Sequence, residues 1–253
     1  MSRFVRGLIG LVCFLAIGEI VGRLGLISQR YLPPTSAVLT ALGHLLVDQT
    51  FLRDVIATLL AWAIALGIAT LIAVPLGLLL GSIPVLRTAT DAIVEFIRPI
   101  PSVALIPLVV LLLGTGPDTK IALATFASVW PILFNTTYGL HEMDPQLVDT
   151  AKSFGMGGLS ISLKVRLPSA APFIMTGIRV ASGIVLITTI STELLASAAG
   201  GLGTFIESAR AGGNQMSQVL AGVAMAGILA YLVNVILERV QNRFFGWSEA
   251  KDA

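Results

Sequence analysis

The sequence predicts an all-α integral membrane protein with about six transmembrane helices, and three observations carry this prediction. The 253-residue chain is 55% hydrophobic but only 12% charged, whereas soluble domains are about 25% charged. Its mean hydropathy is +0.91. Long apolar runs alternate with short polar segments, and the length suits one membrane domain at about 20 residues per span. The net charge of +2 is spread over the span ends and gives no patch for nucleic acid.

The first apolar run covers residues 7–27. Because it is long and lacks a small-residue cleavage site, we expect a retained anchor and not a signal peptide. Glu19 and Arg23 interrupt it one helical turn apart, a spacing that predicts an ion pair. The amphipathic stretch 37–47 predicts an interfacial helix. We therefore expect residues 1–54 to form a first transmembrane helix with an interfacial segment.

Residues 55–245 are expected to form the main membrane domain. Five further spans are predicted at 55–80, 99–113, 120–140, 171–198 and 219–237. The mixed polar and apolar stretch 82–98 predicts a surface helix, and the Gly-rich stretch 200–218 predicts a polar outer loop. Gly77 and Gly81 form a small-xxx-small pair, which predicts close helix approach.

The distribution of basic residues predicts the orientation. With a cytoplasmic amino terminus, 11 of the 16 Lys and Arg residues fall on the inner side, and the other five, Arg23, Arg30, Arg53, Lys120 and Arg210, fall on the outer side. Inner loops are the ones that carry an excess of Lys and Arg. We therefore expect both termini and the segment 145–168 to be cytoplasmic in a multi-pass protein.

Residues 145–168, the elbow segment, form the longest polar interruption after the first 55 residues. Pro145 suits a first helical position, and apolar residues recur on one face at Leu147, Val148, Ala151 and Phe154. Gly155 is suited to end this helix in the left-handed conformation. A second short helix, 159–165, is expected to end before Pro168. The elbow segment should thus be a helix-turn-helix whose exposed apolar ridge enters a groove on a partner.

No catalytic constellation is visible. The chain lacks G-x-x-x-x-G-K-[ST], so it cannot hydrolyse ATP alone. Gly200-Gly-Leu-Gly203 follows a span and lacks the lysine, and we interpret it as a flexible outer turn. His44 and His141 are expected on opposite sides of the membrane, which excludes a shared metal. G-x-S-x-G is also absent, so we expect neither a metal site nor an enzyme.

The predicted span 171–198 carries a polar stripe within an arc of about 80°: Arg179, Ser182, Thr189, Glu193 and Ser197. Such a stripe should face protein or water, not lipid. Two interpretations remain open, namely one wall of a translocation path or hydrogen bonding between helices. Glu193 is expected near the outer surface, where it could gate, meet an extracytoplasmic partner or form a structural ion pair.

The elbow segment resembles the EAA loop of bacterial ATP-binding-cassette importer permeases. That signature reads Glu-Ala-Ala, three residues, Gly, nine residues, Ile, one residue, Leu-Pro. Asp149-Thr-Ala151, Gly155 and Val165-Arg-Leu-Pro168 keep this spacing, with Asp149, Thr150 and Val165 as replacements. Stretches at 32–38, 98–108, 114–120 and 193–203 resemble the nitrate, sulfonate, taurine and bicarbonate branch.

The resemblance implies a MetI-like permease fold for residues 55–245, in a bacterial cytoplasmic (inner) membrane. It implies a permease subunit that translocates a sulfonate, nitrate or related anion. The implied partners are cytoplasmic ATPase subunits, a second permease copy (usually identical), an extracytoplasmic substrate-binding protein and membrane lipid. This chain is expected to bind no cofactor, because ATP and Mg belong on the partner ATPase.

The residues implied to couple to the ATPase are Leu147, Asp149, Ala151, Phe154, Gly155, Leu167 and Pro168. The alternative is a secondary transporter or channel without an ATPase. That alternative would require inverted repeats and ionisable residues at the membrane midplane, and neither is visible in this sequence.

Overall fold

The computed structural model describes residues 3–24, 28, 30–97, 99–196, 200–213 and 215–249. All regular secondary structure in these residues is helical. The long helices are α1 (Arg3–Arg23), α3 (Gln49–Ser82), α6 (Pro117–His141), α9 (Leu167–Ala196) and α11 (Met216–Glu249). Each of these five, with α9 counted from Gly158, contains a stretch long and apolar enough to cross a membrane. The predicted all-α membrane fold is therefore confirmed.

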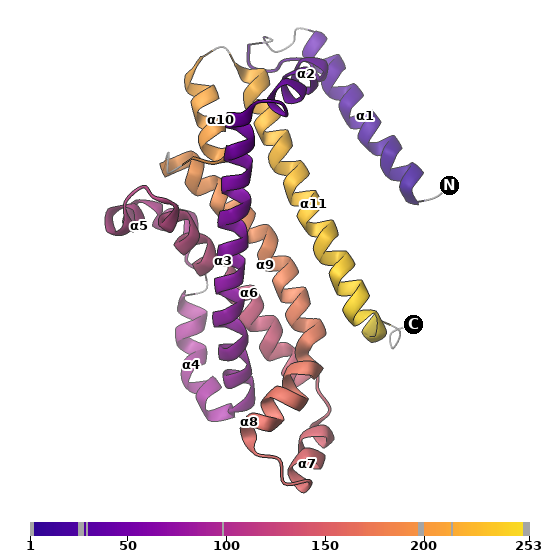
Figure 1. Ribbon diagram of the computed structural model, residues 1–253, viewed down its shortest axis with the longest axis vertical. Helices are drawn as coiled ribbons and strands as arrows, with labels where there is room; N and C mark the ends of the chain where they lie inside the picture. The colour runs from indigo at the N-terminus through magenta and orange to yellow at the C-terminus, as the bar shows by residue number, and fades with distance from the viewer. Residues whose placement is uncertain are drawn as a thin grey trace.

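The predicted span 99–113 is broken into a 3₁₀ turn, η1 (Ser102–Leu105), and a short helix, α5 (Ile106–Leu113). Prolines at 101 and 107 lack the N–H group that an uninterrupted helix needs. The stretch before the break is α4 (Pro84–Ile97), which lies beside the lower part of α3 while α5 lies higher (Figure 1). This region therefore forms two separate helices at one side of the bundle (Figure 1).

Helices α3, α6 and α9 pack side by side at the centre of the molecule (Figure 1). Their contacts use small residues, and the buried alanines Ala65, Ala69, Ala73, Ala124 and Ala181 belong to one core cluster. Gly77 lies against Thr136 so closely that an added Cβ would come within 2.6 Å of the threonine Cβ. Gly81 meets Leu140 in the same way. The small-xxx-small prediction is thus confirmed, since only small residues permit this separation.

One end of the molecule holds α2 (Thr35–Leu45) and α10 (Leu202–Ala211). The predicted Glu19–Arg23 ion pair is confirmed at 2.6 Å, and the Glu19 carboxylate also accepts from the Ser36 N–H at 2.8 Å, which ties α1 to α2. The prediction of a polar loop over 200–218 was wrong. Helix α10 forms there because Leu202, Ile206 and Ala209 recur at helical spacing and are all buried.

The elbow segment lies at the opposite end of the molecule (Figure 1). It contains α7 (Pro145–Ser153), α8 (Gly158–Ile161) and a π-helical turn, η2 (Ser162–Arg166), that leads directly into α9. The expected helix end before Pro168 was therefore wrong. A wider π turn relieves the clash between a proline ring and the preceding turn. As a result α8, η2 and α9 form one continuous helical rod, while α7 lies on the other side of the turn at residues 154–157.

Candidate functional site

Helix α7 begins at a well-formed cap. The Asp144 carboxylate accepts a hydrogen bond from the Gln146 N–H at 2.9 Å, and Pro145 occupies the first turn. A capping carboxylate satisfies a backbone donor that the helix leaves unpaired. These local contacts fix the residue at which α7 begins after the end of α6.

Gly155 ends α7 in the left-handed conformation, with φ +73°. The Gly155 N–H bonds the Lys152 carbonyl at 2.8 Å, and the Met156 N–H bonds the Ala151 carbonyl at 3.1 Å. This paired arrangement is the Schellman motif that glycine favours. A Cβ at Gly155 would meet no atom within 4 Å, so the space beside it is open on this chain.

The elbow segment exposes the large apolar side chains Leu147, Phe154, Leu159 and Leu163, and we call the first three the elbow ridge. Phe154 is 82% exposed, the largest fraction of the three. Ala151 was expected on this ridge, but it is only 6% exposed. It faces inward because α7 packs one side against η2, so it supports the elbow ridge from behind.

The remaining predicted coupling residues differ in exposure. Asp149 is exposed and pairs with Lys152 at 3.0 Å along the same helix. Leu167 is partly buried against the core cluster around Leu140, whereas Pro168 is exposed. Leu167 therefore anchors the elbow to the bundle, while Asp149 lies on its solvent side.

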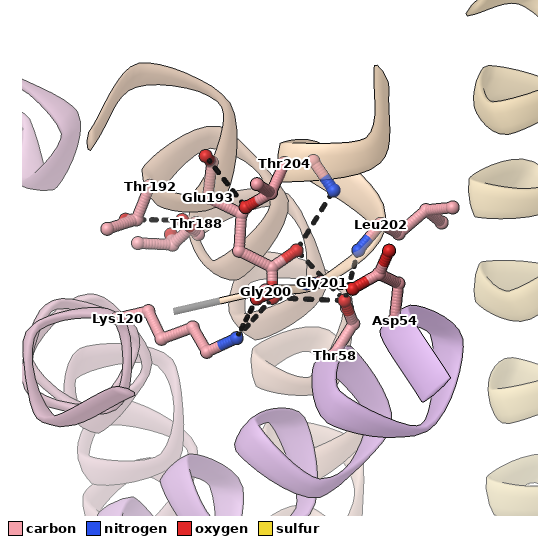
Figure 2. A network of polar contacts seen from close by, with 11 residues as sticks. Asp54, Thr58, Lys120, Thr188, Thr192, Glu193, Gly200, Gly201, Leu202 and Thr204 are labelled. Atoms are coloured by element: carbon pink, nitrogen blue, oxygen red, sulfur yellow. Dashed lines mark hydrogen bonds and ion pairs between the residues drawn. The ribbon is translucent and has the colours of Figure 1, made fainter. Parts of the chain in front are cut away.

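A buried polar network joins four segments at the α10 end of the molecule (Figure 2). The Lys120 ammonium donates to the Glu193 carboxylate at 2.6 Å and to the Gly200 carbonyl at 2.9 Å. The two side chains are only 2% and 0% exposed. The Thr58 hydroxyl lies within 2.9 Å and 3.0 Å of the two Glu193 oxygens. We call this cluster the Glu193 brace.

The glycine turn before α10 is shaped around the Glu193 carboxylate. The Gly203 N–H donates to it at 3.0 Å, and the Gly201 N–H donates to Asp54 at 2.8 Å. Gly201 has φ +131°, and a Cβ there would overlap the Glu193 carboxylate. Gly200 and Gly201 form a bend before α10, where the sequence predicts a turn. A side chain is excluded at Gly201 because the Glu193 carboxylate fills the space.

The contacts of the Glu193 brace suit a structural role and not a catalytic one. Each charge has an opposite charge and further hydrogen-bond partners, as buried charges require. Sequence reasoning missed Lys120 because it placed this residue among the exposed outer cations. The sequence feature that could have indicated the pair is that Lys120 and Glu193 both lie at the outer ends of their predicted spans. Among the described residues, no cluster of three or more His, Cys, Asp or Glu could hold a metal ion.

The polar stripe of α9 faces mainly into the subunit. Ser182 and Thr189 are buried like Glu193, and the Trp62 indole N–H lies 3.3 Å from the Ser182 hydroxyl. Ser182 and Glu193 therefore take part in hydrogen bonds between helices, whereas the buried Thr189 hydroxyl has no hydrogen-bond partner among the described residues. Arg179 differs because its side chain is 33% exposed and reaches α11. Ser197 lies outside the described residues.

Comparison with known proteins gives concordant matches. Residues 73–245 match the family described as binding-protein-dependent transport system inner membrane component. The chain is 33% identical to the taurine transport system permease protein TauC of Escherichia coli (strain K12), over 98% of this chain and 91% of that protein. It is 29% identical to the bicarbonate transport system permease protein CmpB of Synechocystis sp., over 89% and 83%.

A solved structure with a similar fold comes from the MetNI methionine ABC transporter in an inward-facing conformation. The TM-score is 0.67 at 23% sequence identity, and the match covers 76% of this chain and 94% of that chain. This likeness concerns the fold alone.

Proposed function

Because this chain belongs to the family of binding-protein-dependent transport system inner membrane components, and so is a permease subunit of an ATP-binding-cassette importer and not itself an enzyme, we propose that the elbow ridge is its docking surface for the ATPase. The single observation that carries this proposal is an apolar ridge on a rigid, capped elbow. Phe154, 82% exposed, stands beside Gly155, where the chain leaves open space. Exposed apolar patches of this kind mark interaction sites.

The continuity of the elbow with α9 supports a coupling role. Helices 158–161, 162–166 and 167–196 follow one another without a break. A movement of Leu159, the ridge residue on α8, would therefore be passed along α9 as a rigid body toward the Glu193 brace. Leu147 and Phe154 would follow through the contacts of α7 with α8 and η2. ATP and Mg would bind to the partner ATPase subunits, and their closure would bias the permease between two states.

We assign residues 55–245 to the permease domain and residues 1–54 to an additional membrane helix with an interfacial segment. The distribution of basic residues supports a bacterial inner membrane location with both termini and the elbow segment in the cytoplasm. Members of this family work with ATPase and substrate-binding partners. We propose that here the second permease is an identical copy, and that the binding protein docks on the opposite, outer face.

We propose a small oxyanion, such as a sulfonate or nitrate, as the transported substrate. The names of the relatives support this class, because taurine is a sulfonate and bicarbonate is an oxyanion. Arg179, which lies on α9 with a partly exposed side chain, is the predicted path residue that best suits an anion. The buried Ser182, Thr189 and Glu193 would stiffen the wall behind it.

The docking proposal is tested by Gly155→Asp. The space beside Gly155 is open, and aspartate is one of the few residues that tolerate a left-handed φ such as +73°. The subunit should therefore stay folded in the membrane but place a charge against the apolar groove of the ATPase. We expect loss of ATPase co-purification and of ATP-dependent uptake. The matched control is Gly157→Asp, since Gly157 also has open space but an ordinary φ of −71°. Normal uptake by Gly155→Asp would refute the proposal.

A further inference from the structure

Arg179 connects α9 to α11 through two polar contacts. Its Nε donates to the Asn234 side-chain oxygen at 2.9 Å, and its Nη2 donates to the Glu238 carboxylate at 3.1 Å. The Arg179 and Glu238 side chains remain 33% and 47% exposed. The charges are therefore paired but reachable, unlike those of the Glu193 brace.

The depth of Arg179 places this contact within the membrane. Arg179 precedes Glu193 by 14 residues on α9, which corresponds to about 21 Å of helix. If Glu193 lies near the outer boundary of a hydrocarbon layer of about 30 Å, Arg179 lies in the inner half. Charged side chains at such a depth face protein or a water-filled cavity.

The surroundings of Arg179 on α11 are polar. On α11, Asn234, Glu238 and Gln241 recur at helical spacing on one face. Gln241 donates to the Thr176 hydroxyl at 3.3 Å, and its own buried carbonyl oxygen has no hydrogen-bond partner among the described residues. An unpaired amide oxygen is costly in an apolar medium, so the polar row on α11 is not fully satisfied by contacts within the described part of the chain.

The face of α9 next to Arg179 is open along its length. Thr176, Val180, Gly183 and Ile187 follow one another at three- and four-residue spacing and are all exposed. A Cβ at Gly183 would meet no atom within 4 Å. Arg179 thus lies at the edge of a continuous exposed stripe.

We propose that Arg179, Asn234 and Glu238 form a transient oxyanion site in the inner half of the translocation path, an inference that rests on the proposed function. A guanidinium binds planar or tetrahedral oxyanions through paired N–H groups. The anion displaces Glu238 from Nη2, while Asn234 keeps Nε oriented. When Glu238 returns to the guanidinium, the anion is released. Competition of this kind keeps binding weak, as conduction requires.

The site is tested with methanesulfonate as the probe, on the purified permease–ATPase complex without the binding protein. Ligand-observed NMR of the methyl signal suits a weak site. Arg179→Gln should abolish the signal from bound probe. Glu238→Gln should lower the Kd about fivefold, because a partly exposed ion pair no longer competes.

The matched control is Glu207→Gln on α10. Glu207 also pairs with an arginine, Arg210, on the same helix, and the hydrogen bond from Arg210 lowers the pKa of the Glu207 carboxyl, so this pair is charged at neutral pH. The control removes a paired carboxylate on α10, at the end of the molecule that holds α2 and α10 (Figure 1), and should leave the Kd unchanged.

Three outcomes overturn the site: binding by Arg179→Gln equal to the unmodified protein, no binding by the unmodified protein, or a Glu238→Gln Kd that stays the same or rises. A rise would mean that the pair only clamps α9 to α11.

Stimulation of ATPase activity by the binding protein is measured on the same preparations. If stimulation persists while anion binding is absent, only the oxyanion site fails. If no ATPase associates with the chain, the proposed function fails.

Discussion

Lys120→Met tests whether the Glu193 brace stabilises the outer end of the bundle. The substitution removes the ammonium 2.6 Å from the Glu193 carboxylate and leaves that charge with only the Thr58 hydroxyl and the Gly203 N–H. Removing one partner of a buried ion pair costs about 3–5 kcal/mol. The midpoint of thermal unfolding falls by about 2–4 °C per kcal/mol in chains of this size. We therefore expect a decrease of at least about 6 °C.

The assay is thermal unfolding of the purified subunit in detergent, for Lys120→Met, Glu193→Gln and the double variant. The double variant removes both charges, so it should recover most of the loss, because the main cost is an unpaired buried charge. Lys152→Met is the matched control, since Lys152 pairs with Asp149 on the exposed elbow. A Lys120→Met midpoint within about 2 °C of the unmodified protein, or no recovery in the double variant, would refute the reasoning.

Three further substitutions probe other features. Gly201→Ala should destabilise the subunit by about 2 kcal/mol or more, because its Cβ would overlap the Glu193 carboxylate. The control Gly183→Ala, whose Cβ meets open space, should change the midpoint of thermal unfolding little. Equal midpoints for these two variants would contradict the prediction. Asp144→Ala removes the α7 cap and should lower stability by about 1 kcal/mol, seen as faster proteolysis at the elbow; an unchanged digestion rate would argue against the cap. Phe154→Ala should weaken ATPase co-purification at least tenfold while the midpoint of unfolding stays unchanged, and full co-purification would remove Phe154 from the docking surface.

Apolar runs and glycine positions were sufficient to predict most of the fold. The α7 helix, its end at Gly155 and the Glu19–Arg23 pair depend on contacts close in sequence, and the structure contains all three. The small-residue contacts at Gly77 and Gly81 were also foreseeable, because helix packing in membranes requires close approach.

Other features depend on packing between elements, which a local sequence pattern does not record. A glycine-rich turn alone gives no indication that a glutamate from the preceding span fills the space beside it, so the contact of Gly201 with Glu193 could not be predicted. Lys120 and Glu193 are 73 residues apart, and no local pattern pairs them. Ala151 shares an apolar face with Leu147 in sequence, but only the packing of α7 against η2 decides which of them is buried.

The π-helical turn at Ser162–Arg166 also sets an angular phase. An extra residue in a helix rotates everything beyond it by about 100°. Deleting one residue from this turn would rotate α8 and its ridge residue Leu159 about the α9 axis by about 100°, and would change the surface against which α7 packs. The direction in which this part of the ridge faces an incoming subunit is thus set by the number of residues in a single wide turn.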